Sequence, residues 1–173
     1  MVGGPADRAY DVVLVDPPYA TPDGEVKGWL ADAYAHGWLA ADAVDVVERG
    51  RGAAHVLLVE SDPRAARVIR ENVAALRAAP AARLVTGKVV TVLAAGPDGD
   101  PYDVVFADPP YAVSDAEVTA MLAALVDGGW LAADALVIVE RSSRSGPVTW
   151  VEGVTGERSR RYGETTLWYG RRS

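Results

Sequence analysis

The sequence predicts a single α/β domain organised around a mostly parallel, doubly wound β-sheet. Short runs of Val, Leu and Ile end at Gly, Pro or Asp, and they are apolar throughout instead of alternating with polar residues. Such runs are typical of strands that are covered on both faces. Helical patterns separate several of these runs, and strands that alternate with helices form parallel sheets. With 173 residues, 50% of them apolar, the chain can bury a full core without a disulfide, and it contains no cysteine.

Six strands are expected, together with two helices that are marked by the residues at their starts. Asp62 followed by Pro63 combines an N-cap with a favoured first helical residue, so one helix is expected to begin there. A second helix is expected to open with Asp115 and Glu117. The strands are expected at 11–15, 43–47, 55–60, 83–86, 103–107 and 135–140. The first helix has the apolar stripe Ala65, Val68, Ile69, Val73 and Leu76, and the second has Val118, Met121, Leu122 and Leu125.

The carboxyl-terminal part of the sequence has a different pattern. Segments 148–154 and 165–169 are strand-like, and the charged stretch 157–161 separates them. This pattern predicts an antiparallel hairpin at the edge of the sheet.

An internal repeat links two distant parts of the chain. Residues 10–49 align without a gap with residues 102–141, and roughly 24 of about 40 positions are identical. Both copies contain Asp-Pro-Pro-Tyr-Ala and end in Val-Glu-Arg. Two units are too few for a solenoid, which needs at least about three. We therefore expect one domain over 1–173, with a duplicated β-α-β segment in 1–50 and the main body in 51–173.

Charge is distributed unevenly along the chain, whose net charge is −7. From Arg141 to the end, Arg residues exceed Glu residues by four, so the preceding part is strongly acidic. A solvated Arg-rich end and a surface for an anionic partner both explain this basic tail. No apolar run reaches the roughly 20 residues of a membrane helix. A soluble, cytoplasmic protein without membrane contact is the expectation.

The second Asp-Pro-Pro-Tyr motif is the strongest chemical signal. Asp108 directly follows the expected strand 103–107, at the carboxyl end where open α/β sheets bind ligands. Pro109 and Pro110 stiffen the backbone and remove two N–H donors, which leaves a rigid corner of acceptors. A carboxylate and a carbonyl in such a corner can accept hydrogen bonds from one exocyclic amine, and the Tyr111 ring can stack on a planar base. This arrangement is suited to the amino group of an extruded nucleobase.

These residues resemble a known family. A strand followed by Asp-Pro-Pro-Tyr is similar to the signature of amino-group methyltransferases that use S-adenosylmethionine. Further segments resemble the bacterial 16S ribosomal RNA guanine-N2 methyltransferase family over about 51–173. The segments that carry the resemblance are 51–62, 65–76, 102–111, 139–141 and 161–167.

The resemblance implies a Rossmann-like class I methyltransferase fold and methyl transfer from S-adenosylmethionine to the exocyclic N2 of a guanine. The implied partner is 16S ribosomal RNA or the small ribosomal subunit, and the implied protein is a monomer that needs no metal.

The resemblance also implies roles for individual residues. Glu60, at the end of its strand, would accept the ribose hydroxyls of the cofactor with Ser61 and Asp62 beside it, and the backbone of Gly87 and Lys88 would contact the adenine.

On the substrate side, the resemblance assigns the target base to the Asp-Pro-Pro-Tyr corner. Asp108 and the carbonyls beside Pro109 and Pro110 would orient the amine, with Tyr111 stacked on the base. The residues expected near the target pocket are Arg161, Tyr162 and Gly163.

The chain departs from the family before residue 51. The family has there a strand and an acidic, Gly-rich loop for the methionine end of the cofactor, and an amino-terminal basic arm. This chain has the first repeat copy, with Asp16-Pro17-Pro18-Tyr19. About seven residues separate 43–47 from 55–60, fewer than the dozen that a parallel crossover needs. The first strand and Gly-rich loop are therefore expected to be missing or replaced, and cofactor binding to be weak.

The departure keeps two other interpretations open. One is a non-catalytic RNA-binding relic, in which the basic tail and the Tyr residues hold RNA without a cofactor. The other is a rearranged open reading frame that folds poorly, for which a broad, non-cooperative melt is expected. RNA binding without methyl transfer would distinguish the relic from the enzyme.

Overall fold

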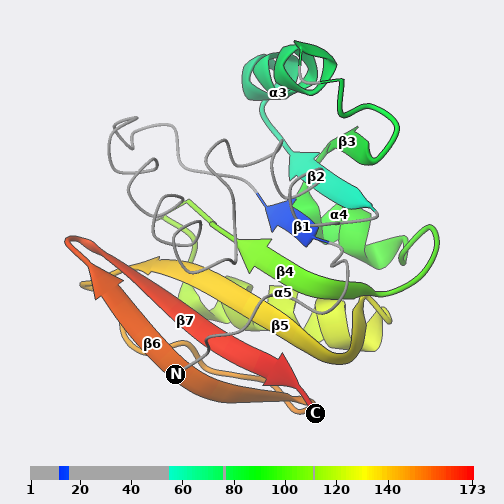
Figure 1. Cartoon of the computed structure of the whole chain (residues 1–173). Coiled ribbons are helices and arrows are strands. Elements are labelled where there is room, and N and C mark those ends of the chain that lie inside the picture. Colours follow the sequence, from blue (N-terminus) through cyan, green and yellow to red (C-terminus); the bar gives the residue numbers. More distant parts are fainter. Residues whose placement is uncertain (1–11, 16–54, 76, 111) are drawn as a thin grey trace, which may run out of the picture.

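A computed structural model describes residues 12–15, 55–75, 77–110 and 112–173, which form one seven-stranded sheet with helices against it (Figure 1). The strand order is β3-β2-β1-β4-β5-β7-β6. The first five strands are parallel, whereas β7 is antiparallel to β5 and β6 to β7. The strands are β1 (Val12–Val15), β2 (Val56–Glu60), β3 (Ala82–Thr86), β4 (Tyr102–Ala107), β5 (Leu131–Ser142), β6 (Val154–Tyr162) and β7 (Thr165–Arg172). The helices are α3 (Pro63–Ala75), α4 (Val89–Ala94) and α5 (Asp115–Asp127). The predicted α/β fold with a closing hairpin is confirmed.

Strand β1 lies at the centre of the sheet, between β2 and β4. Val12 pairs with Val56 on one side and with Val104 on the other. The second pairing has the same 92-residue offset as the sequence repeat, so the first strands of the two copies lie side by side in register. The expected gap at the first-strand position is thus filled by the strand predicted at 11–15. The strand predicted at 43–47 lies outside the described residues.

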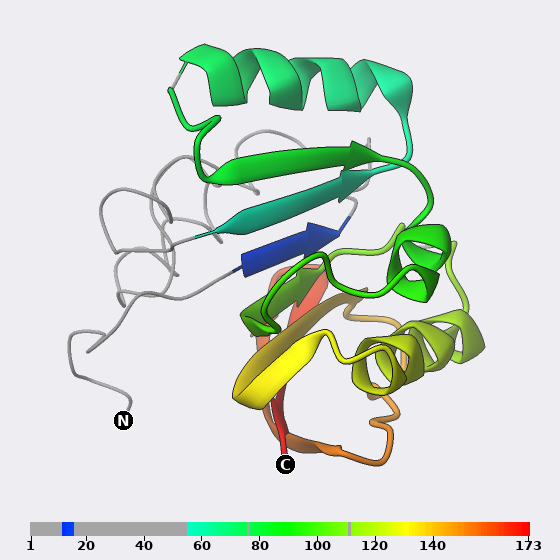
Figure 2. The same cartoon turned by 90° about the vertical axis from the view of Figure 1, so that its right-hand side faces the viewer.

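The core of the domain has two sides. On one side, α4 and α5 lie together against the sheet (Figure 2) and bury the inward residues of the central strands. Trp130 belongs to the core on this side. Its ring is buried and stacks on Tyr102 at a centroid distance of 6.0 Å. On the other side, α3 packs on β2 and β3, and a smaller cluster covers β4, β5 and β7. None of the described helices is long and apolar enough to cross a membrane.

The helix starts agree with the sequence prediction. Asp62 Oδ1 accepts hydrogen bonds from the backbone N–H groups of Arg64 and Ala65, at 2.5 and 3.1 Å, and so caps α3. At α5, Ser114 and Glu117 form a reciprocal capping box. All four apolar residues predicted for the second helix are buried, namely Val118, Met121, Leu122 and Leu125.

Two details of the helix prediction need correction. The stripe predicted for α3 included Val68, which is 54% exposed, whereas Ala66 and Val73 are buried. The inward side of α3 is a narrow line formed by Ala66, Ile69 and Val73. Val68 lies beside that line and therefore remains exposed. The short helix α4 was not predicted, because its Val-rich sequence is more typical of a strand.

The hairpin prediction was right in kind and wrong in its bounds. The charged stretch 157–161 lies inside β6, whereas residues 148–153 lie outside any strand. In the described sheet, β6 is the last strand of the order and pairs only with β7, so its charged side chains remain in solvent. Charged residues are common on edge strands, because they prevent pairing with other chains.

Candidate active site

Three buried acidic residues lie in one row toward the carboxyl-terminal edge of the parallel strands. One line of paired residues crosses the sheet from β2 to β5. Val15 of β1 pairs with both Val59 and Ala107, and Ala107 pairs with Val139. The next residues along these strands are Glu60, Asp108 and Glu140, which are 1%, 5% and 0% exposed. Among the described residues, these three are the only acidic ones that are buried.

The Glu60 end of the row contains all of the residues predicted for the cofactor. Glu60 Oε1 accepts a hydrogen bond of 2.6 Å from the Asp62 backbone N–H, which fixes the carboxylate. The Gly87 backbone N–H donates to the Glu60 carbonyl at 2.9 Å, because Glu60 pairs with Thr86 across β2 and β3. Ser61 and Lys88 are exposed beside them. The structure thus brings the five predicted cofactor residues together.

The Asp108 end of the row is the Pro-Pro corner. Asp108 and Pro109 are buried and Pro110 is half-buried, so the corner is packed into the protein. The Pro110 carbonyl accepts a hydrogen bond of 2.8 Å from the Val113 N–H, which closes a turn after the motif. Tyr111 lies outside the described residues. Two strand spacings separate β2 from β4, so Glu60 and Asp108 are about 10 Å apart along the edge.

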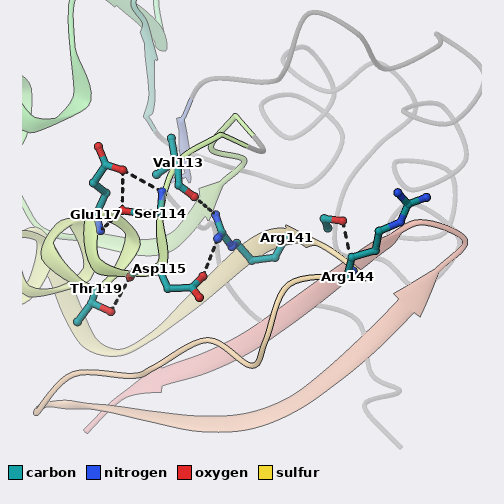
Figure 3. A network of polar contacts seen from close by, with 8 residues as sticks. Val113, Ser114, Asp115, Glu117, Thr119, Arg141 and Arg144 are labelled. Atoms are coloured by element: carbon teal, nitrogen blue, oxygen red, sulfur yellow. Dashed lines mark hydrogen bonds and ion pairs between the residues drawn. The ribbon is translucent and has the colours of Figure 1, made fainter.

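Arg141 forms hydrogen bonds to the segment that follows the Pro-Pro corner (Figure 3). It is only 5% exposed, and its guanidinium donates to the Val113 carbonyl at 2.9 Å and to Asp115 Oδ1 at 2.6 Å. Arg141 therefore joins the end of β5 to the loop and to the first turn of α5. A buried guanidinium with these bonds restricts the movement of the loop that begins at Asp108.

Removal of the Arg141 guanidinium is expected to loosen this loop. Arg141→Met leaves the half-buried Val113 carbonyl without its donor, so a loss of about 1–3 kcal/mol in the free energy of unfolding is expected. Arg144→Met is the matched control, because the Arg144–Glu164 ion pair has both side chains at least 76% exposed and such pairs contribute little. Urea denaturation compares the two variants, and equal stability in both would contradict the role of Arg141.

Glu140 is a site residue that the sequence analysis did not assign. Burial and the neighbouring charge of Asp108 raise the pKa of Glu140 to about 9. The Thr165 hydroxyl donates a long hydrogen bond of 3.4 Å to Glu140 Oε1. A signal was present in the sequence, since an acid ends the apolar run 135–140 as Glu60 ends its own strand.

The predicted target-pocket residues lie at the turn between β6 and β7. Arg161 Nε donates to the Gly163 carbonyl at 3.0 Å, and Gly163 has a φ of 56°, a conformation that favours glycine. Tyr162 pairs with Thr165 and contacts the apolar cluster over β5 and β7. The strand β6 is three spacings from β4, or about 14 Å. The structure therefore does not bring these three residues into contact with Asp108.

Only some of the Arg side chains in the basic tail form a basic surface. Arg141 is internal, and Arg144 and Arg171 form ion pairs with Glu164 and Glu157. In contrast, Arg158 lies over the ring of Tyr169 at 4.5 Å, and Arg160 over that of Tyr162 at 5.2 Å. These four residues, here called the Arg–Tyr face, project from the same side of the hairpin as Glu140 does from β5.

The comparison with solved structures identifies the fold of the chain. Solved structures that share the fold include a putative methyltransferase from Escherichia coli, with a TM-score of 0.68, 24% identity, and coverage of 98% of this chain and 79% of that one. A putative methylase from Haemophilus influenzae has a TM-score of 0.66, 19% identity, and coverage of 97% and 89%. The chain has the Rossmann-like class I methyltransferase fold.

The family follows from the sequence comparisons. A family model described as Conserved hypothetical protein 95 matches residues 49–171, and the chain belongs to this family. The chain is also 36% identical over 104 residues to Ribosomal RNA small subunit methyltransferase D of Escherichia coli strain K12. That match covers 58% of this chain and 50% of the relative, so the chain spans about half the length of the curated relatives it matches. The resemblance predicted from the sequence is confirmed.

Proposed function

We propose that this chain transfers a methyl group from S-adenosylmethionine to the exocyclic N2 of a guanine in 16S ribosomal RNA. The observation that carries the proposal is the buried Asp108 at a rigid Pro-Pro corner, in one row with Glu60. The name of the curated relative, a small-subunit ribosomal RNA methyltransferase, supports the same substrate class. The proposed enzyme is a cytoplasmic monomer that acts on the small ribosomal subunit or its RNA.

The residues at the Glu60 end fit the nucleoside part of the cofactor. A carboxylate at the end of the second strand is the usual acceptor for ribose hydroxyls in such folds. Glu60 is held by the Asp62 N–H, and Gly87 is bonded to it through the backbone. The fit is poorer at the methionine end, because β1 is followed in the sequence by Asp16-Pro17-Pro18-Tyr19, in which the prolines have no N–H to donate.

The Asp108 corner would act by orientation. The cofactor supplies an electrophilic methyl group on a positively charged sulfur. Asp108 and the carbonyls of the Pro-Pro corner accept hydrogen bonds from the guanine amine and direct its nitrogen toward that methyl group. The nitrogen–carbon bond forms while the carbon–sulfur bond breaks, the sulfur keeps the bonding pair, and the Asp108 carboxylate can accept the proton that the amine releases. Burial of the corner keeps water away from the reacting atoms.

The Arg–Tyr face favours RNA as the partner and also supports a second candidate function. Arg side chains stacked on Tyr rings offer charge for phosphates and planar surfaces for bases. A protein with this face and without a complete cofactor site would bind RNA and transfer no methyl group. Non-catalytic RNA binding is therefore the alternative function.

A methyl-transfer assay distinguishes the two candidate functions. Labelled S-adenosylmethionine is incubated with the protein and either 30S subunits or deproteinised 16S ribosomal RNA, and the modified nucleoside is identified by mass spectrometry. N2-methylguanosine that depends on the protein is the expected product. RNA binding in a filter assay with no labelled nucleoside would support the alternative.

Weak cofactor binding is expected of the isolated chain. The sequence after β1 has Asp16-Pro17-Pro18-Tyr19 in place of the Gly-rich loop whose N–H groups bind the cofactor's amino-acid end. Within the described residues, the site that we assign to the cofactor is the one for its nucleoside part. Titration calorimetry of S-adenosylmethionine into the protein is expected to show weak binding. Adenosine analogues without the amino-acid part of the cofactor are expected to bind nearly as well. A low-micromolar Kd for the whole cofactor would contradict the expectation.

A further inference from the structure

Asp108 and Glu140 are neighbours on adjacent parallel strands. Ala107 pairs with Val139, so the next residues along the two strands lie beside one another, about 4.8 Å apart between their backbones. Both project from the same face as Phe106 and Ile138, two residues earlier in each strand. The two carboxyl side chains therefore lie on neighbouring strands, one directly after β4 and the other near the end of β5.

Glu140 is enclosed in the protein. It is 0% exposed, whereas Asp108, at the start of the loop, is 5% exposed. Within the described part of the chain, Glu140 Oε2 makes no hydrogen bond, and Oε1 has only the Thr165 hydroxyl at 3.4 Å. An ionised carboxylate in such a place would lack the donors that it needs.

Among the described residues, the charged and titratable groups that face Glu140 do not supply a close cation. Asp108 faces it from β4, and Tyr169 and Arg171 belong to the same side of β7. Arg158, Arg160 and Tyr162 lie one strand further, on β6. Arg141, its chain neighbour, is directed to Val113 and Asp115.

We propose that Glu140 is a positioning residue that holds a proton beside Asp108, so that the pair carries one negative charge and this charge stays on Asp108. Two carboxylates side by side in a buried site cannot both ionise. The proton stays on the fully buried member, and the member at the loop remains an acceptor for the target amine. The catalytic consequence of this proposal rests on the proposed function. The protonation state of Glu140 can be tested without any methyl transfer.

The first test measures stability against pH. Free Glu ionises near pH 4.3 in the unfolded chain, whereas the folded chain keeps the Glu140 proton to about pH 9. Between these values the folded state binds the extra proton, so the wild type should lose stability as pH rises. Glu140→Gln has a neutral side chain of the same shape and should lack this loss.

Urea denaturation of the wild type and of Glu140→Gln between pH 5 and pH 9 gives the result. The midpoint of the wild type is expected to fall relative to that of the variant over this range. Glu152→Gln, which removes one exposed carboxyl from the loop before β6, is the matched control for net charge. A constant difference between wild type and Glu140→Gln would mean that Glu140 is ionised in the folded protein, and would overturn the proposal.

The second test measures methyl transfer against pH. Glu140→Gln is expected to lose the decline in activity that the wild type shows as Glu140 ionises near pH 9. A pH profile of the variant identical to that of the wild type would contradict the role of Glu140. If no variant transfers methyl groups at any pH, the proposed function fails, and the stability result still decides the protonation of Glu140.

Discussion

Asp108→Ala is expected to reduce methyl transfer by at least about 100-fold, while the protein remains folded. The substitution removes the Asp108 carboxylate from the Pro-Pro corner, and a misplaced amine would no longer lie in line with the methyl group. The expected loss is in kcat, since the proposed role of Asp108 is to orient the base at the reacting atoms, whereas the proposed role of the Arg–Tyr face is RNA binding. Labelled-methyl assays with saturating 30S subunits measure this effect.

Asp16→Ala is the matched comparison, because Asp16 begins the same four-residue motif in the first repeat copy. The variant is expected to retain methyl transfer, since only the Asp108 copy is followed by the segments that resemble the family up to 161–167. Equal loss in both variants would mean that the second copy is not the unique site. Circular dichroism of both variants controls for folding.

Trp130→Ala is expected to destabilise the fold by about 3–5 kcal/mol, because it removes a large, fully enclosed ring. Trp130 is 2% exposed, its indole N–H donates to the Leu93 carbonyl at 3.0 Å, and its own carbonyl accepts from the Tyr102 N–H at 2.8 Å. It thus joins the end of α4 to the starts of β4 and β5, the two strands that position Asp108 and Glu140. A decrease of roughly 10 °C in Tm is expected by calorimetry.

Trp130→Phe separates the two contributions. The smaller ring keeps the contact with Tyr102 and loses the hydrogen bond to Leu93, so a loss of about 1–2 kcal/mol is expected. If both variants melted at the temperature of the wild type, the ring would not hold these elements together.

The fold could be predicted largely because the parallel strands are apolar on both faces and the helices have clear starts. Asp62 and Ser114 determine where α3 and α5 begin, and both caps form through local bonds that the sequence specifies. The central position of β1 was not predicted. Strand order depends on pairing across the chain, and a four-residue Val/Leu segment pairs equally well with many partners.

The candidate site was predictable in part for the same reason. Glu60 and Asp108 each follow a recognisable strand, so their place at the carboxyl edge could be inferred. Glu140 was not assigned, since its role depends on the register between β4 and β5 and on its complete burial. Arg141 was counted as part of a basic tail, because its bonds to Val113 and Asp115 arise only when β5 lies beside the loop.

The most direct test of the account is the structure of the chain bound to S-adenosylhomocysteine and its target RNA. We expect the extruded guanine to lie at the end of β4, with its amino nitrogen within roughly 3 Å of an Asp108 carboxylate oxygen. A base held on the Arg–Tyr face, with Asp108 turned away from the nucleotide, would contradict it.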